Sequence, residues 1–204
     1  PQIIKSYASG DIERMCNLVI NGSRLGCYLL LFLGIPLFIK IEWVLNMWLG
    51  QCPQHTVAFM RIAMIEAFFR TMGNATVVAM HATGRMKILN IVIAPILLMV
   101  LPMSYILFTL GFSSEIVLMF NICPWAIVPL VRIFLVKKYV GDKFSIKNYI
   151  FRVYLNNILL AVLMFFVPFY VSEVIGLEND FHGFIILGIV SVISSSFILL
   201  FIGM

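Results

Sequence analysis

Ionisable side chains interrupt one long apolar run of this chain, and they are the residues best suited to do chemistry. The run extends from Thr56 to Lys87 and carries Arg61 among its apolar side chains. At about 100° of rotation per residue, four further polar side chains of a continuous helix would fall within roughly one quadrant. These four are Glu66, Arg70, Asn74 and His81. Because an ionisable group in hydrocarbon costs at least about 2.5 kcal/mol, we expect this stripe to face protein or a water-filled path.

The spacing of Glu66 and Arg70 allows two interpretations. Residues four apart lie on the same face of a helix, so the carboxylate and the guanidinium can pair. The structural interpretation is an ion pair that lowers the cost of both charges within the membrane. The functional interpretation is a cation-biased lining for an anionic solute, because arginine binds phosphate oxygens in a bidentate manner. Asn74 and His81 would either extend this lining or form hydrogen bonds between helices.

Arg61 and Arg132 are two further arginines within apolar runs and complete the set of candidate lining residues. Arg61 lies on another face of its helix, nearer the start, and Arg132 lies four residues before the run ends at Val136. A long arginine side chain near the end of a span can reach the lipid headgroups while its stem stays in apolar surroundings. Each of these two arginines could therefore either reach the lipid headgroups or line the cavity.

The sequence contains no catalytic constellation, so we do not expect an enzyme. His55, His81 and His182 fall in different segments, and none has a serine, cysteine or carboxylate at a useful spacing. Zinc-protease, CxxC and glycine-rich phosphate-binding motifs are absent from the sequence, and the four cysteines show no paired or ligand-like spacing. We expect no cofactor, and coupling to a proton or sodium gradient stays open.

The composition predicts a polytopic membrane protein. Of the 204 residues, 62% are hydrophobic and 11% are charged, whereas soluble domains carry about 25% charged residues. The formal net charge of +5 comes from basic residues in short loops between apolar runs, which is a signal of membrane topology and not of nucleic-acid binding. The predicted fold class is therefore all-α, with the phospholipid bilayer as its surroundings.

The apolar runs predict six transmembrane helices. In chain order they cover residues 25–39, 56–82, 88–112, 116–136, 153–171 and 181–204. Asp11 is the expected N-cap of an amphipathic lead-in at the membrane surface. Trp43 and Trp48 bracket a short in-plane helix or turn at the interface, which Gly50 and Pro53 end. The chain thus divides into the lead-in (1–24), four spans (25–136), a basic cytoplasmic loop (137–152) and two terminal spans (153–204).

The distribution of lysine and arginine sets the expected topology. The N-terminal segment, the turn at Gly84 and the loop after Val136 carry nearly all the basic loop residues. The alternate connections, which are the segment after Lys40, the turn at Ser113 and the acidic loop before Phe181, carry only Lys40. Positively charged loops remain on the cytoplasmic side, so both chain ends are expected there. Because the chain starts at a proline and ends within an apolar run, we expect a fragment of a longer protein.

Several stretches in order resemble the multidrug/oligosaccharidyl-lipid/polysaccharide (MOP) exporter superfamily, and most of all its bacterial polysaccharide (O-antigen-type) flippases. The stretches are PQIIKSYASGD (residues 1–11), IPL (35–37), LNMWLG (45–50) with Pro53, and ATGRMK (82–87). Their order and spacing match the second half of such proteins, and the resemblance covers nearly the whole chain.

The resemblance implies a parent transporter of 12–14 helices in two lobes around a central cavity. This chain would supply most of the C-terminal lobe and the two terminal helices, and its partner would be the missing N-terminal half. The implied activity is translocation of an oligosaccharide linked to undecaprenyl pyrophosphate across the bacterial cytoplasmic (inner) membrane by alternating access. The alternatives are a cation-coupled multidrug (MATE-type) exporter, which would be expected to hold unpaired carboxylates within its spans, and a non-transporting membrane scaffold.

Overall fold

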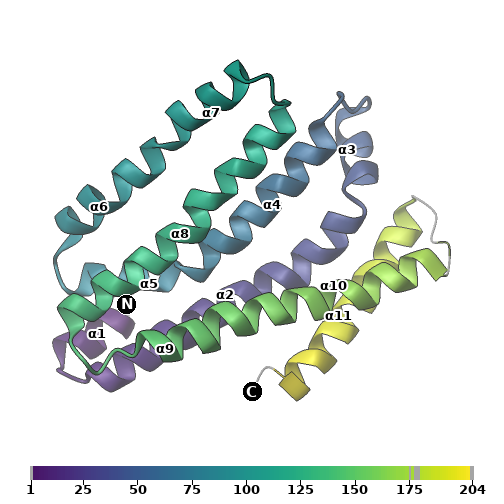
Figure 1. The fold of residues 1–204 in the computed structure, drawn as a ribbon. Coiled ribbons are helices and arrows are strands. Elements are labelled where there is room, and N and C mark those ends of the chain that lie inside the picture. The colour runs from purple at the N-terminus through teal and green to yellow at the C-terminus, as the bar shows by residue number, and fades with distance from the viewer. Residues whose placement is uncertain (1, 175, 177–179, 203–204) are drawn as a thin grey trace.

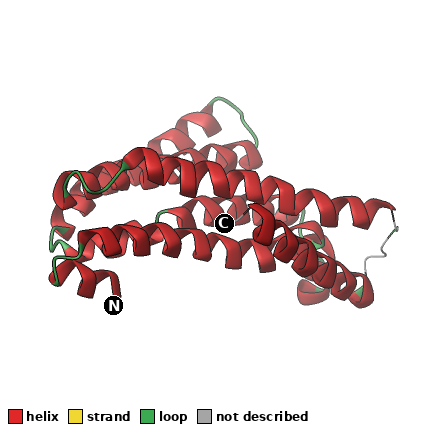
Figure 2. Cartoon of the chain, turned by 90° about the horizontal axis from the view of Figure 1, so that it is seen from below, coloured by secondary structure: helices red, strands yellow, loops and turns green. Residues whose placement is uncertain are grey.

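The structure, a computed structural model, describes residues 2–174, 176 and 180–202, with side chains up to residue 200. Residues 1, 203 and 204 and part of the predicted acidic loop lie outside this range. Within it every regular element is helical, as Figure 2 shows, and the prediction of an all-α protein is confirmed for these residues.

The helices follow one another through short connections. In chain order they are α1 (Gln2–Ala8), α2 (Ile12–Ile39), α3 (Ile41–Leu49), α4 (Thr56–Met72), α5 (Asn74–Ala82), α6 (Met86–Leu98), α7 (Val100–Thr109), α8 (Ser114–Val140), α9 (Ile146–Tyr149), the π-helical segment η1 (Ile150–Leu155), α10 (Asn156–Val174) and α11 (Phe181–Ile202).

The long helices lie beside one another in an order that differs from their order in the chain (Figure 1). α6 and α7 pack against α8, and α8 packs against α4 and α5. α2 packs against α4 and α5 as well, and it also contacts α10 and α11. The pair α4–α5 therefore lies between α2 and α8, and the predicted polar stripe is at the centre of the arrangement.

Helix α2 joins the predicted lead-in and the first span into one element. The Asp11 carboxylate accepts a hydrogen bond from the backbone N–H of Arg14 at 3.0 Å, so the predicted N-cap is confirmed. The helix has 28 residues, about 42 Å at roughly 1.5 Å per residue, which exceeds the hydrocarbon core of about 30 Å. Met15 and Val19 are fully buried, so the face predicted to be apolar packs against the protein.

The prediction of one continuous helix over residues 56–82 is wrong, because the chain breaks at Gly73. α4 ends at Met72 and α5 begins at Asn74. A Cβ atom placed on Gly73 would lie 2.9 Å from the Cβ of Pro129 on α8. Only glycine allows so close an approach of the two helices, since real Cβ atoms do not come within this distance of another carbon. The break is therefore where α4–α5 meets α8 most closely.

The predicted third span, residues 88–112, is also interrupted. α6 ends at Leu98 and α7 begins at Val100. Pro102 has no amide hydrogen to donate to the carbonyl of Leu98, four residues earlier, which explains the interruption at this turn.

The predicted basic loop of residues 137–152 is longer than the loop of the structure. α8 continues to Val140 and α9 begins at Ile146, so the connection is residues 141–145 and the next span begins before Val153. Lys147 and Arg152 are exposed, whereas Tyr149 on the same helical segment is buried. The charged side chains therefore lie on the outer face of a helix, where charge is compatible with helical structure.

Contacts between distant segments identify the two ends of the helix array. At one end the thiol of Cys16 donates to the carbonyl of Lys143 at 4.0 Å, which joins the start of α2 to the loop after α8. At the other end, the ring of Trp43 stacks on Phe184 with centroids 5.6 Å apart, which joins α3 to the start of α11. The predicted basic and non-basic connections thus gather at opposite ends, as Figure 1 shows.

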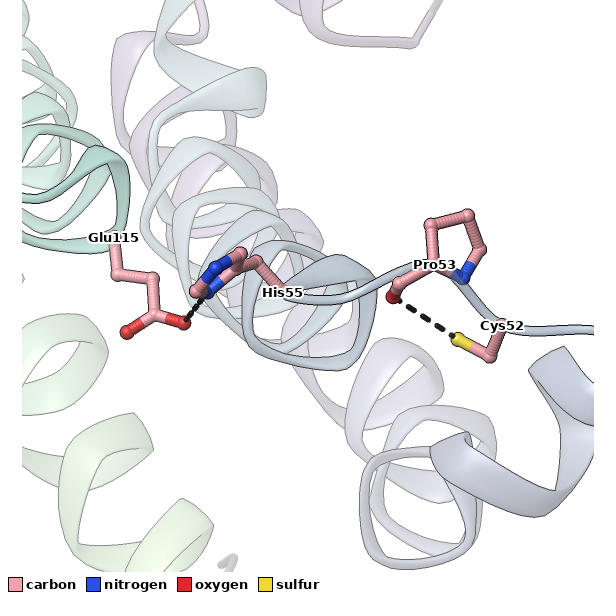
Figure 3. Close-up of polar contacts among 4 residues, drawn as sticks. All are labelled: Cys52, Pro53, His55 and Glu115. Atoms are coloured by element: carbon pink, nitrogen blue, oxygen red, sulfur yellow. Dashed lines mark hydrogen bonds and ion pairs between the residues drawn. The ribbon is translucent and has the colours of Figure 1, made fainter.

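A contact between two exposed polar side chains joins α4 to α8 at the end of the array that holds α3. Nδ1 of His55, before α4, lies 2.7 Å from Oε1 of Glu115 in the first turn of α8 (Figure 3). His55 has a φ of 71°, and it is the one non-glycine residue with positive φ in the described part of the chain. Histidine is enriched among such residues. The pair fixes the start of α4 against the start of α8.

Among the described residues, five helical stretches are long and apolar enough to cross a membrane: Ile12–Ile39, Met86–Thr109, Ser114–Val140, Ile146–Val174 and Phe181–Leu200. The chain is therefore a multi-pass membrane protein. The predicted span over residues 56–82 is not among them, because α4 has 17 residues, about 26 Å, before the break at Gly73. The count of six remains a prediction that requires α4 and α5 to cross together.

Candidate functional site

Glu66 and Arg70 form an ion pair on α4, as their spacing predicted. Nη1 of Arg70 lies 3.8 Å from Oε1 of Glu66. Glu66 follows Thr56 by ten residues, about 15 Å along the helix, which is half of a hydrocarbon core of about 30 Å. The Arg70 side chain is 56% exposed and the Glu66 side chain 28%. The pair is long and open, so the guanidinium keeps hydrogen-bond donors free for another group.

Trp125 on α8 supports the guanidinium of Arg70. Cζ of Arg70 lies 4.8 Å from the centroid of the indole ring, within the distance at which a cation is attracted to an aromatic face. The sequence interpretation did not include Trp125. Its position in the middle of a span was an available signal, because membrane tryptophans concentrate at the interfaces.

Arg132 lies further from the end of its helix than the sequence indicated. α8 continues to Val140, so Arg132 is eight residues, about 12 Å, from the end of the helix. It is partly buried, and its Nε atom is buried without a hydrogen-bond partner. Arg132 also lies near Tyr149 and Tyr154 and in the neighbourhood of Arg70, whose like charge opposes its own. With Glu66 as the one carboxylate of the cluster Glu66–Arg70–Arg132, the formal charge of the cluster is positive.

Tyr149 holds the break in α4–α5 in place. Its hydroxyl donates a hydrogen bond to the carbonyl of Met72 at 2.7 Å, at the residue where α4 ends. The hydroxyl of Ser23 on α2 lies 2.8 Å from the same oxygen. Because the tyrosine proton goes to Met72, Ser23 is the donor in the second bond. One fully buried side chain thus joins α9, α2 and the end of α4.

Tyr154 makes the equivalent contact to α8. Its hydroxyl donates to the carbonyl of Ala126 at 3.1 Å, three residues before the proline at which α8 approaches Gly73. Tyr149 directly precedes the π-helical segment η1 and Tyr154 lies within it, and in such a segment the backbone bonds join residues five apart. Tyr149 reaches α4 and α2 from this segment, whereas Tyr154 reaches α8. The sequence interpretation missed both tyrosines, since no local pattern indicates a π-turn.

The other predicted site residues do not join this cluster. Asn74 opens α5 on the far side of the break and His81 lies near its end, and both are exposed. Arg61 stacks on Phe38 of α2, with Cζ 5.8 Å from the ring centroid. No described contact connects these three residues to Glu66 or Arg70. The predicted stripe thus divides into Glu66 and Arg70 on α4 and Asn74 and His81 on α5. Arg61, which was predicted on another face of the helix, makes its contact with α2.

The arrangement suits binding of a phosphate group better than bond-making chemistry. Arg70 and Arg132 offer planar sets of N–H donors that match phosphate oxygens. In the described part of the chain no group of three or more histidine, cysteine, aspartate or glutamate side chains is placed to hold a metal ion. No protein-family model, curated protein or solved structure matches the chain. The functional argument therefore depends on the sequence stretches quoted above and on these side chains.

Proposed function

We propose that this chain is part of a flippase that moves an oligosaccharide linked to undecaprenyl pyrophosphate across the bacterial cytoplasmic membrane. The observation that carries the proposal is the cluster of Glu66, Arg70 and Arg132 near the middle of the membrane. Its positive charge complements the pyrophosphate of such a lipid. The ordered sequence stretches that resemble polysaccharide flippases support the same cargo.

The exposure of Arg70 supports a surface that further helices complete. A guanidinium that is more than half exposed at this depth would be costly if acyl chains surrounded it. Helices from the remaining part of the transporter would enclose the cluster in a hydrated cavity and remove this cost. The partners in this proposal are therefore the lipid-linked oligosaccharide and the N-terminal half of the parent protein.

The interrupted helices fit transport by alternating access. The chain breaks at Gly73 and at Met99, and α8 contains Pro124 and Pro129. Breaks of this kind in membrane helices are tolerated where other groups satisfy the freed backbone atoms, and at the break of Gly73 the Tyr149 hydroxyl donates to the carbonyl of Met72. Elements joined by breaks can tilt relative to one another, which movement of a large headgroup requires.

A cation-coupled multidrug exporter is the second candidate, and Glu66 is the observation that favours it. Among the described helices Glu66 is the carboxylate furthest from a helix end, and ion-coupled transporters use carboxylates at such depths. Its pairing with Arg70 is the reason for preferring the first candidate, since coupling by ion binding favours an unpaired carboxylate.

Charge reversal at Arg70 tests the proposal in the cell that makes the whole protein. We expect Arg70→Glu, introduced at the native gene, to abolish the surface polysaccharide while the protein level, measured by immunoblot, is retained. The matched control is Arg85→Glu, because Arg85 also lies over an aromatic ring, 4.9 Å from the centroid of Tyr139, but at the membrane surface. Normal polysaccharide in the Arg70 variant contradicts the proposal. Raised drug susceptibility with unchanged polysaccharide supports the second candidate.

A further inference from the structure

A groove lined by apolar side chains runs between α2, α4 and α10, apart from the charged cluster. Its volume is about 450 Å³. Its lining includes Leu30, Gly34 and Phe38 from α2, Phe68 from α4, and Val162 and Phe165 from α10. Gly34 leaves room in the lining, because the nearest atom that a Cβ there would meet is Cε of Met64 at 3.8 Å.

The guanidinium of Arg61 lies at one end of the groove. Phe38 is in the lining, and the guanidinium carbon of Arg61 lies 5.8 Å from the centroid of its ring. Arg61 follows Thr56 by five residues, about 8 Å along α4, so its head can reach the headgroup level. Its Nε atom is buried and has no hydrogen-bond partner among the described residues. The N–H group at Nε of Arg61 is therefore a hydrogen-bond donor without an acceptor among the described residues.

The groove has the length of a lipid chain within one leaflet. From Phe38 to Leu30 is eight residues of α2, about 12 Å, against about 15 Å for half of the hydrocarbon core. A helix about 10 Å thick would displace roughly twice the groove volume over this length. The space thus accepts one chain and not a further helix.

We propose that this groove binds an anionic phospholipid of the bilayer, with its phosphate on Arg61 and one acyl chain along α2, α4 and α10. The guanidinium of Arg61 matches phosphate oxygens. Its positive charge selects an anionic headgroup, because a zwitterionic headgroup brings a cation of its own next to it. The apolar lining and the single-chain width select the acyl chain. This site is separate from the cluster of Glu66, Arg70 and Arg132, and it stands whether or not that cluster binds a lipid-linked sugar.

Competition between two phospholipids tests the proposal. The whole protein that contains this chain is purified from its membrane, freed of lipid, and mixed with equal amounts of phosphatidylglycerol and phosphatidylcholine, and native mass spectrometry reports the lipid retained. We expect the wild type to retain phosphatidylglycerol preferentially. We expect Arg61→Gln to reduce that preference about tenfold, as loss of a hydrogen bond to a charged group implies. Arg85→Gln, the surface control, leaves it unchanged.

The groove is tested by filling it. Gly34→Leu should abolish retention of both phospholipids, whereas Gly34→Ala, whose added carbon fits, should retain them. Should Gly34→Leu fail to elute as folded protein, Val162→Phe fills the groove from α10, where the side chain is 47% exposed. An unchanged preference in Arg61→Gln, or unchanged retention in a folded groove variant, overturns the proposal. So does displacement of the lipid by inorganic phosphate alone, because the groove would then contribute nothing.

Discussion

The guanidinium of Arg70 and the indole ring of Trp125 are stacked, with Cζ of Arg70 4.8 Å from the ring centroid. This contact joins α4 to α8, and Glu66 pairs with Arg70 from one turn earlier on α4. Cation–π contacts are worth about 0.5–2 kcal/mol, which is enough to orient the arginine without neutralising its charge. Trp125 therefore helps to orient the Arg70 side chain, in addition to the ion pair with Glu66.

Removing both charges of the ion pair distinguishes its structural and functional interpretations. An exposed pair at 3.8 Å contributes at most about 1 kcal/mol, so Glu66→Gln/Arg70→Gln should be produced and inserted like the wild type. We expect this double variant to lose surface polysaccharide, because the phosphate-binding charge is gone. Immunoblotting and polysaccharide staining of the same cells measure both properties. A double variant that still displays normal polysaccharide would leave only the structural interpretation.

Gly73→Ala should destabilise the protein through its contact with α8. The added Cβ would lie 2.9 Å from Cβ of Pro129 and 3.3 Å from its backbone Cα, so the helices must move apart. Overpacking of this kind costs about 1–3 kcal/mol. Unfolding in mixed micelles with increasing dodecyl sulfate, followed by circular dichroism, measures the loss. Gly22→Ala is the control, since its Cβ would meet Cβ of Ala75 at an ordinary 3.7 Å, and equal stability of the two variants would contradict the packing argument.

Tyr149→Phe should weaken the junction of α9, α2 and α4. The change removes the donor to Met72 and leaves Ser23 without its acceptor. Hydrogen bonds within membranes average about 0.6 kcal/mol and reach about 1.7, and we expect a value near the upper limit because one hydroxyl serves two partners. A double-mutant cycle with Ser23→Ala gives the coupling between the two hydroxyls. Tyr105→Phe, whose ring is 72% exposed, is the control; additive effects of Tyr149→Phe and Ser23→Ala would count against the junction.

Thiol labelling of intact cells tests the expected orientation. Cys52 lies in the connection between α3 and α4, at the end opposite the basic loops. A membrane-impermeant maleimide should therefore label Cys52 from outside the cytoplasmic membrane, and Cys52→Ser should remove the signal. In that background Asp142→Cys, in the loop after α8, should react only after the membrane is permeabilised. The reverse pattern would place the basic loops outside.

Much of the fold was predictable because its signals are local. The Asp11 cap, the end of the interfacial helix at Gly50 and the apolar spans each depend on residues close together in the sequence. The pairing of Glu66 with Arg70 is local in the same way, since the two residues lie one helical turn apart.

The remaining features depend on contacts that a single segment does not show. A glycine within an apolar helix is compatible with continuity, and the break at Gly73 follows only from its approach to Pro129. The division of the predicted stripe between α4 and α5 follows from that break. The π-turn between Tyr149 and Tyr154 likewise satisfies carbonyls on α4 and α8 that lie far away in the sequence.

Access of water to the charged cluster is the most direct test of the account. In a protein whose Cys52 and Cys123 are replaced by serine, cysteine is introduced at Glu66, at Arg70 or at Leu101, whose side chain is 68% exposed on α7. A charged, water-soluble methanethiosulfonate is then added to the whole transporter in its membrane, and the modification rates are compared. We predict rapid modification at positions 66 and 70 and none at position 101, because a hydrated cavity faces the former and lipid faces the latter. If positions 66 and 70 are as unreactive as position 101, no water-filled path reaches the cluster and the proposed transport route is contradicted.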